Sequence, residues 1–326
     1  MGVMTGHHLA RAGARITFVV RAARARQMPA QFRVYSYDDG STAVFDGFDV
    51  RPGAAALAGG GHDFVVLALD GASLGDDEGR ALLAAIGDAI GDGATQLVVG
   101  SIGIGLRELV VGATRLPDHR VSSGRIAALG HKTQGVTLKL HPPTDPQQLA
   151  QADFGMRHLQ GAGFVIEDRN PELARGFAEI FDRSGLATCQ VVPADQFALH
   201  SRAIFPVFLA SELLGWPDAD RLTGDATLWP LCVEAVRAIM GLAEHGQAGA
   251  AAAAGLSAAM LSAIWRGLEA AALPLDWQSF NAYQHGDRVR TADHRLLEGC
   301  VRRGEAERRD MAAVRELLAR VGGAAR

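Results

Sequence analysis

The sequence predicts an α/β protein in which a parallel, doubly wound sheet is followed by an all-helical domain. Three short apolar runs, 16–20, 63–69 and 96–99, have the composition of strands buried inside a parallel sheet. Segments with helical spacing separate these runs, and strands that alternate with helices are typical of such sheets. Beyond Asp195 the chain is rich in Ala and Leu, and strand signals almost vanish.

The length of 326 residues is comfortable for two hydrophobic cores. The composition changes near Pro193, and we place the domain boundary there. We therefore expect a sheet-containing domain at 1–193 and a helical domain at 194–326. Within the helical domain, Ala248–Trp265 carries no charge over about 18 residues, which is the lower limit of a membrane span. Its Ala, Gly and Ser content is only weakly apolar, so we expect a helix packed in a bundle and no membrane association.

Composition excludes several classes of function. Hydrophobic residues make up 48% and charged residues 21% of the chain, which is typical of a globular protein. The formal net charge of -4 gives no electrostatic reason to expect binding to nucleic acid or to a membrane surface. The three cysteines are far apart and form no CxxC pair, which argues against a disulfide framework or a metal site and favours a reducing cytoplasm. The N-terminus shows no secretory signal.

The opening segment has features of a dinucleotide-binding unit. Residues 2–12 (GVMTGHHLARA) predict a helix that stops at Gly13, and the apolar strand 16–20 follows. A dinucleotide site needs a strand, a G-x-G-x-x-G turn and a helix whose free amides face the diphosphate. Counting back along the helix, Gly2 takes the third glycine position, where the helix must pack closely on a strand.

The strand and the two glycines that normally precede this helix lie upstream of Met1 or are absent from the molecule. We interpret Met1 as an internal methionine and expect a natural chain longer by about ten residues, the size of one strand and its turn. The alternative is a surface helix in which Gly2 and Gly6 merely allow close packing.

Arg21 indicates the type of cofactor. It stands at the carboxyl end of strand 16–20, where NAD-specific proteins usually place an acidic residue that binds the ribose 2′-hydroxyl. An arginine at this position, with Arg24 and Arg26 just beyond it, can hold a 2′-phosphate through charge-assisted hydrogen bonds. We therefore expect NADPH as the cofactor. The alternative is a solvated basic loop.

In this combination the residues resemble the ketopantoate reductase (2-dehydropantoate 2-reductase) family. The matching features are LARAGARITFVVR at 9–21, the apolar third strand, the glycine turn GSIGIG at 100–105 and the helical second half. The layout matches over nearly the whole chain, and the specific matches lie in 2–21 and 96–109. The resemblance implies a Rossmann-type domain whose first strand is missing from this chain, and hydride transfer from NADPH to a 2-keto acid.

The glycine turn departs from the family pattern, which has Asn-Gly-x-Gly. This chain has Ile102-Gly103-Ile104-Gly105, so the glycines that let a backbone approach a cofactor are retained but the amide is lost. A Lys that the family has at the end of the third strand is replaced here by Leu69 or Asp70. The resemblance implies a cofactor-binding set made of Gly2, Arg21, Leu69, Asp70, Ser101, Ile102, Gly103 and Gly105.

The catalytic lysine of the family lies on the first helix of the second domain, with an Asn one turn later. The matching segment, 195–206, has no Lys and carries Pro206 near the Asn position. Arg202 is the nearest cation and can orient a carboxylate or stabilise an alkoxide, but a guanidinium holds its proton too tightly to be a good proton donor. His200 is the better general acid. The alternative is an ordinary helix surface or a satisfied interdomain pair.

Near the C-terminus the family has a Ser followed by an acidic residue on a later helix, and Ser279 and Asp293 are our candidates for these positions. Asn281 and Glu298 lie in the same run of polar residues. The glycine-flanked turn His285–Arg288 is polar enough to line a cleft, and a solvent-exposed helix start is the alternative.

The sequence therefore predicts a reductase that transfers a hydride from NADPH to a small 2-keto acid or a related carbonyl compound. Because the family's Lys and Asn are missing, we expect a substrate other than ketopantoate. We expect the helical domain to bind the substrate and to support a homodimer. The competing hypothesis is a non-catalytic dinucleotide-binding protein, in which the fold persists and the chemistry has gone.

Overall fold

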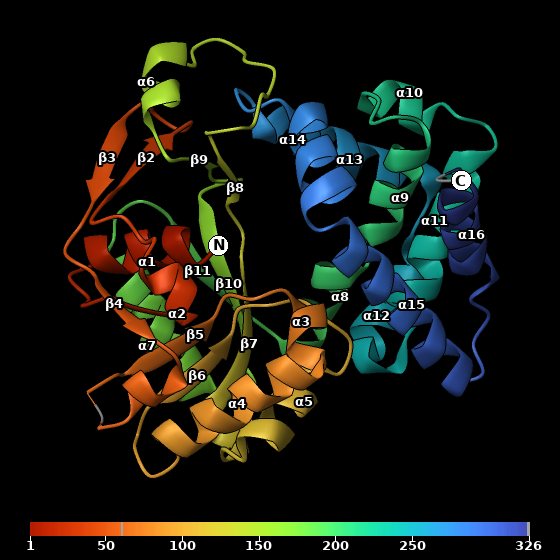
Figure 1. Cartoon of the computed structure of the whole chain (residues 1–326). Helices are drawn as coiled ribbons and strands as arrows, with labels where there is room; N and C mark the ends of the chain where they lie inside the picture. Colours follow the sequence, from red (N-terminus) through yellow and green to blue (C-terminus); the bar gives the residue numbers. More distant parts are fainter. Residues whose placement is uncertain (60, 325–326) are drawn as a thin grey trace. The chain divides into compact units, whose positions relative to one another are not determined.

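The computed structural model describes residues 1–59 and 61–324. The chain divides into two compact units (Figure 1). The first unit is Met1–Val136 together with Pro142–Val192, and the second is Thr137–His141 together with the chain from Pro193 onward. The division after Val192 lies beside the boundary expected near Pro193. The short segment Thr137–His141, which the sequence placed in the first domain, belongs with the second unit.

A five-stranded sheet forms the centre of the first unit. Its strand order is β11-β10-β7-β6-β5, and β5, β6 and β7 are parallel. β10 runs antiparallel to β7 and parallel to β11. The strands are β5 (Phe64–Leu67), β6 (Gln96–Val99), β7 (Val121–Ile126), β10 (Ala162–Glu167) and β11 (Thr188–Val192). The expected alternation of buried strands with helices is confirmed, because helices α4 and α5 lie between these parallel strands in the chain.

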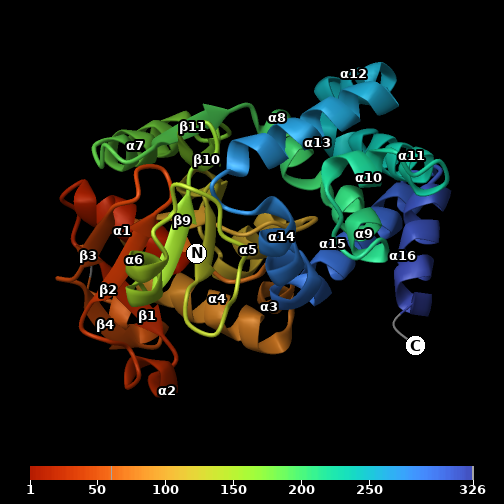
Figure 2. The same cartoon turned by 90° about the horizontal axis from the view of Figure 1, so that it is seen from above.

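Helices cover both faces of this sheet. On one face Leu97 and Val99 share a buried cluster with residues of α4 (Asp77–Ile90) and α5 (Leu106–Thr114). On the other face Val98 and Phe164 pack with α7 (Pro171–Asp182), which lies beside β10 and β11 in Figure 2. Successive residues of β6 thus contribute to opposite cores, as expected for a strand buried on both sides.

Two smaller sheets complete the first unit. β1 (Thr17–Val20) pairs in parallel with β4 (Asp49–Pro52). A four-stranded sheet has the order β3-β2-β9-β8, in which β2 and β3 form an antiparallel hairpin. Its strands are β2 (Phe32–Ser36), β3 (Thr42–Phe45), β8 (Leu129–Lys132) and β9 (Phe154–Arg157), and the remaining helices of the unit are α1 (Gly2–Arg11), α2 (Ala22–Ala25), α3 (Gly71–Gly75) and α6 (Pro146–Gln151).

The two sheets that contain β1 and β5 meet without hydrogen bonding to each other. Within the described residues, β5 pairs only with β6, and β1 pairs only with β4. Val19 of β1 and Leu67 of β5 nevertheless pack in the same apolar cluster. The fold is therefore the predicted Rossmann-type arrangement, with no described strand hydrogen-bonded between β1 and β5.

A buried relay of histidines ties α1 to the four-stranded sheet. Nδ1 of His8 donates to the carbonyl of Met4 at 2.8 Å, so its Nε2 accepts from Nε2 of His158, also at 2.8 Å. Nδ1 of His158 donates to Asp38 at 2.5 Å, and the ring of His8 stacks on Phe181. Burial lowers the pKa of His8 to about 4. Burial alone would raise the pKa of Asp38, but hydrogen bonds from His158 outweigh it and the pKa is lowered.

The second unit is all-helical, as predicted from its composition. α11 packs against both α9 and α16, and Cys232, Leu209 and Leu317 are buried there. The helices are α8 (Ala194–Arg202), α9 (Phe205–Leu213), α10 (Ala219–Thr223), α11 (Leu228–Met240), α12 (Gly246–Gly255), α13 (Ala258–Ala272), α14 (Trp277–Tyr283), α15 (Arg290–Ala306) and α16 (Ala312–Ala324).

The uncharged stretch Ala248–Trp265 is not one helix. It is divided between α12 and α13, and the axes of the segments Ala243–Gly255 and Ala258–Ala272 differ by 106°. This bent pair passes a membrane-span test on length and composition, whereas no single helix of the described chain does.

Candidate active site

The residues predicted to bind the cofactor around the fourth strand lie together at the carboxyl edge of the parallel strands. The hydroxyl of Ser101, just after β6, donates to the carbonyl of Leu69, just after β5. A Cβ atom on Gly71 would collide with the carbonyl of Ile102, so the start of α3 packs directly on the glycine turn. The sequence placed Leu69, Ser101 and Ile102 in one site, and the structure brings them into one cluster of backbone contacts.

The glycine turn ends at Gly105, whose φ of +62° lies in the left-handed region that favours glycine. Gly105 is the N-cap of α5, and no side chain caps this helix. The N-cap therefore supplies no side-chain acceptor to the amides of the first turn, which is the arrangement found at helix starts that bind anions. By contrast α4 begins at Asp76, whose carboxylate accepts from Gly79 N.

Asp70 has a different function from the cationic residue that the resemblance implies at this position. Its carboxylate accepts from the amide of Ser73 at 2.8 Å and from the Ser73 hydroxyl at 2.5 Å, which caps α3. Leu69 is 41% exposed. The end of β5 therefore presents an apolar side chain and a carboxylate that is already engaged by α3.

The start of α1 lies at the same edge. A Cβ atom on Gly2 would sit 3.4 Å from the Cβ of Ala68, which directly follows β5. Further along the helix, Leu9 joins the cluster that contains Phe64, the first residue of β5. α1 therefore runs antiparallel to β5, and it begins, like α5, without a side-chain cap.

Arg21 lies at the same carboxyl edge, at the end of the next strand. Since α1 leads away from the carboxyl edge, β1 leads back to it, and Arg21 directly follows β1 as the N-cap of α2. Arg21, Arg24 and Arg26 are all exposed. Among the described residues no salt bridge involves these three arginines. The predicted grouping of Gly2 with Arg21 is consistent with this geometry.

In the second unit, His200 and Arg202 differ in exposure and surroundings. Both lie on α8, but residues two apart on a helix point to different sides. His200 is exposed, whereas the Arg202 side chain is 12% exposed and its guanidinium lies 2.6 Å from the carboxylate of Glu244. Glu244 in turn lies 4.0 Å from the ring of the fully buried His245. Arg202 therefore belongs to a largely buried ion pair that the sequence did not suggest.

Ser279 lies in a cluster that sequence reasoning missed. Its hydroxyl accepts from the backbone amide of Lys139, and its own amide donates to Asp276, the N-cap of α14. Nε2 of His141 is 2.7 Å from the other oxygen of Asp276, and Nζ of Lys139 is 3.9 Å from that oxygen. Burial alone would raise the pKa of Asp276, but hydrogen bonds from His141 and Ser279 outweigh it and the pKa is lowered.

The signal for this cluster is divided between distant parts of the chain. An Asp followed three residues later by Ser, as in Asp276 and Ser279, marks a helix start that a sequence can reveal. His141 lies 135 residues before Asp276. No local pattern joins those two positions, so their contact becomes visible only in the folded chain.

Asp293 pairs with His285. The two are 2.7 Å apart, and a π-helical turn at Gln284–Arg288 places His285 against Phe208, on which its ring stacks. Burial raises the pKa of Asp293, and hydrogen bonding to His285 opposes this effect only in part. π-Helical turns are frequent at functional sites. This buried pair can hold one proton between an imidazole and a carboxyl group and deliver it to an oxygen atom.

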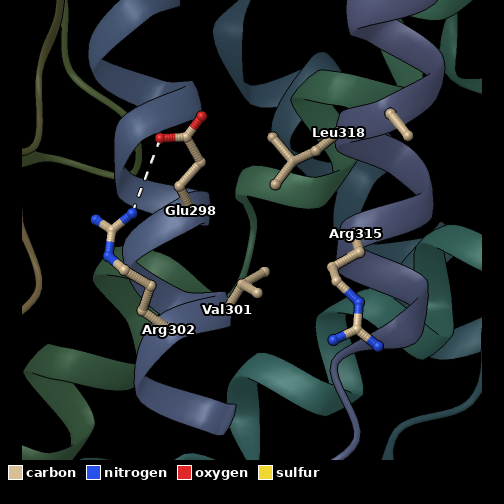
Figure 3. Close-up of a pocket in the computed structure, with 6 residues that line it drawn as sticks. Glu298, Val301, Arg302, Arg315 and Leu318 are labelled. Carbon is tan, nitrogen blue, oxygen red and sulfur yellow. Dashed lines mark ion pairs between the residues drawn. The ribbon is translucent and has the colours of Figure 1, made fainter. Parts of the chain in front are cut away.

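A groove elsewhere in the second unit has none of these features. Figure 3 shows it between α15 and α16, with Glu298 and Arg302 on its rim at 4.0 Å from each other. An exposed ion pair of this kind contributes little stability. The four residues predicted to be catalytic are not among its described lining residues, which are Glu298, Val301, Arg302, Arg315, Leu318 and Ala319.

Comparison with known proteins identifies the fold. No protein-family model matches the sequence, and a search of curated proteins finds no match. The solved 2-dehydropantoate 2-reductase from Methylococcus capsulatus is similar with a TM-score of 0.64 and 20% identity, over 97% of this chain and 90% of that one. The dimeric ketopantoate reductase from Staphylococcus aureus is similar with a TM-score of 0.62 and 12% identity, over 98% of this chain and 94% of that one. D-Mandelate dehydrogenase, solved with NADH and anilino(oxo)acetate, is similar with a TM-score of 0.64 and 12% identity, over 98% of this chain and 94% of that one.

This chain has the ketopantoate reductase fold. At 12% to 20% identity the likeness concerns the arrangement of the backbone. What the ketopantoate reductase fold does in this protein depends on its own side chains: the glycine turn after β6, the exposed arginines after β1, and the histidine–carboxylate pairs of the second unit.

Proposed function

We propose that the protein is an NADPH-dependent reductase that acts on a small 2-keto acid or a related carbonyl compound. The observation that carries the proposal is the glycine turn at 101–105, which is locked to the end of β5 through Ser101 and leads into the uncapped start of α5. Backbone that a cofactor can approach closely, followed by free helix amides, is what a dinucleotide requires at the carboxyl edge of a parallel sheet.

The choice of NADPH over NADH rests on Arg21. It follows β1 directly, is exposed, and has Arg24 and Arg26 beside it, so the end of β1 presents cations where an NAD-binding protein has a carboxylate. One solved neighbour, D-mandelate dehydrogenase, binds NADH, so the fold alone does not decide between the two cofactors.

Fluorescence titration with each dinucleotide tests this choice. We expect NADPH to bind more tightly than NADH by about 10-fold or more, since a charge-assisted bond to a phosphate is worth about 1.5–3 kcal/mol. Arg21→Gln should weaken NADPH binding and leave NADH binding almost unchanged. Equal affinities of the wild type for NADH and NADPH would refute the assignment.

The reaction needs a hydride for the carbonyl carbon and a proton for the carbonyl oxygen. When bound, the reduced nicotinamide supplies the hydride. For the proton we favour the pair of His285 and Asp293, which lie 2.7 Å apart and in which burial raises the pKa of Asp293. Ser279, His200 and Arg202 remain proposed contributors to substrate binding.

The activity is tested by screening 2-keto acids as substrates and measuring the loss of NADPH absorbance.

A second candidate function is that of a dinucleotide-binding protein without activity. It is favoured by Asp70 and Arg202, because Ser73 and Glu244 already engage their charged groups. Tight NADPH binding without turnover of any keto acid would select this second candidate. Weak binding of both dinucleotides would exclude both proposals.

We also propose that the protein works as a cytoplasmic homodimer. The support is the S. aureus ketopantoate reductase, a dimer of the same fold, and three cysteines that are buried and unbridged in the described chain. Light scattering of the purified protein should give twice the mass of 34.3 kDa.

A further inference from the structure

Arg125 lies at the carboxyl end of β7, one residue before the strand ends at Ile126. Because β7 runs parallel to β6, its carboxyl end is at the same edge of the sheet as the glycine turn that follows β6. The sequence analysis assigned no role to this residue. Its position places a guanidinium on the third of three adjacent parallel strands that end at the proposed cofactor site.

The side chain of Arg125 extends on the face of the sheet covered by α5. Side chains alternate along a strand, so Arg125 shares a face with Val121, which packs in the cluster that contains Leu106 and Val110 of α5. Gly124 faces the opposite side, where a Cβ atom would come 2.5 Å from the ring of Phe164. The strand therefore cannot turn its arginine away without displacing that ring.

Arg125 is a partly exposed cation whose Nε is buried, and no described carboxylate pairs with it. Its Nε has no hydrogen-bond partner, and no salt bridge within residues 1–59 and 61–324 involves it. Burial lowers its pKa, and no neighbouring carboxylate offsets that effect. A desolvated charge of this kind costs stability unless something pairs with it.

Arg120, a buried arginine on the same stretch of chain, shows what a structural role requires. Its guanidinium donates to the carbonyls of Thr95, Gly91 and Ile90 at 2.6–3.0 Å, which closes the end of α4. Every nitrogen of Arg120 thus has a protein acceptor. Arg125 makes no hydrogen bond or ion pair through its side chain within the described residues, so we look for its partner outside the chain.

We propose that Arg125 binds the carboxylate of the substrate. This inference rests on the proposed function and names the substrate class more closely, as a compound with a carboxylate beside its carbonyl. A guanidinium presents two parallel N–H groups that fit the two oxygens of a carboxylate.

The position of Arg125 favours the substrate over the cofactor as the source of the anion. In a fold of this type the adenosine half of the dinucleotide binds with the first βαβ unit, and the diphosphate lies at the start of its helix. Here these places correspond to Arg21 and α1. The nicotinamide half then lies toward the later strands, β6 and β7, where the remaining anionic group is that of the substrate.

Binding of oxamate, an unreactive analogue of a 2-keto acid, tests the proposal. We expect oxamate to raise the Tm of the wild type, in the presence and in the absence of NADPH, and to have no effect on Arg125→Met. Arg125→Lys keeps the charge but loses the two parallel N–H groups of the guanidinium. It should bind oxamate about 10- to 100-fold more weakly. Equal Tm shifts in wild type and Arg125→Met, or no shift in the wild type, would overturn the proposal.

The NADPH titration separates this result from the fate of the proposed function. Arg125→Met should bind NADPH as tightly as the wild type does. Loss of NADPH affinity in this variant, with oxamate binding retained, would mean that Arg125 holds a cofactor phosphate and would refute the assignment to the substrate. If the protein binds oxamate but no dinucleotide, the proposed anion site stands and the proposed reductase function is refuted.

A stability measurement distinguishes a ligand-binding role from a structural one. Removing an unpaired, partly buried charge should not lower the Tm of Arg125→Met without ligand, and should raise it by up to about 2 °C. The matched control is Arg120→Met, which should lower the Tm because it leaves three carbonyls without donors. A fall in Tm of similar size in both variants would show that Arg125 is a structural residue.

Discussion

Nδ1 of His285 lies 2.7 Å from the carboxylate of Asp293, and both groups are largely shielded from water. Burial raises the pKa of Asp293, so the pair retains a proton more readily than an exposed carboxylate would. The carboxyl group also orients the imidazole, so the pair can deliver a proton from a fixed position, as a general acid must.

Asp293→Asn and His285→Gln should each lower kcat by about 100-fold on the keto acid that the screen identifies, because proton delivery is lost. NADPH affinity should stay within a factor of about two of the wild type, which fluorescence titration checks. His200→Gln is the comparison, since His200 is exposed on α8. If His200→Gln loses turnover and His285→Gln keeps it, the proton source is His200, as the sequence first suggested.

Two glycines of α3 offer a matched test of the cofactor site. A Cβ atom on Gly71 would collide with the carbonyl of Ile102, whereas a Cβ on Gly75 has nothing within 4 Å. Gly71→Ala should push the glycine turn away from the end of β5 and weaken NADPH binding by at least about 10-fold. Gly75→Ala should bind NADPH as the wild type does, and both affinities come from the same fluorescence titration. Equal NADPH binding by the two variants would mean that this turn does not contact the cofactor.

The fold and part of the site could be predicted because their signals are local. The parallel strands β1, β5 and β6 are short apolar runs, and Gly103 and Gly105 mark the turn after β6 within a few residues. Arg21 follows its strand directly, so its place at the carboxyl edge depends only on the strand having been identified.

The rest of the site depends on contacts between distant residues. Arg202 was predicted to share a catalytic role with His200, two positions before it, and no local pattern revealed its contact with Glu244, forty-two positions later. The His141 and Asp276 contact joins positions 135 residues apart. Arg125 was overlooked for another reason: an arginine in a strand is ordinary in sequence, and what makes it unusual is that no carboxylate in the described part of the chain pairs with it.

The ion pair between Arg202 and Glu244 should stabilise the second unit. The two groups are 2.6 Å apart and their side chains are 12% and 22% exposed. Arg202→Met should therefore lower the free energy of unfolding by about 1–3 kcal/mol, because it leaves Glu244 shielded from water without its partner.

A double-mutant cycle checks this prediction by denaturant unfolding. Glu244→Gln combined with Arg202→Met should cost less than the sum of the two single changes. Strict additivity would show that the pair contributes nothing. If Arg202→Met leaves stability unchanged but abolishes keto-acid binding, Arg202 serves the substrate instead.

The histidine relay in the first unit predicts a loss of stability in mild acid. Burial is the main cause that lowers the pKa of His8 from 6.5 to about 4, and it has the same effect on the neighbouring His7. An imidazole with a lower pKa in the folded state takes up its proton preferentially when the chain unfolds. The stability is therefore complete above about pH 6.5 and is lost as the pH falls toward about 4.

Denaturant unfolding at a series of pH values measures this loss. A shift of one pKa unit corresponds to about 1.4 kcal/mol, so His8 alone should account for a fall of roughly 2–3 kcal/mol across this window. The lowered pKa of Asp38 acts only below its ordinary value of 3.8, outside the window. His8→Gln keeps an acceptor for His158 but cannot be protonated, so its stability should depend less steeply on pH. A slope as steep as that of the wild type would mean that the loss arises elsewhere, and His7→Gln would then be the next variant to measure.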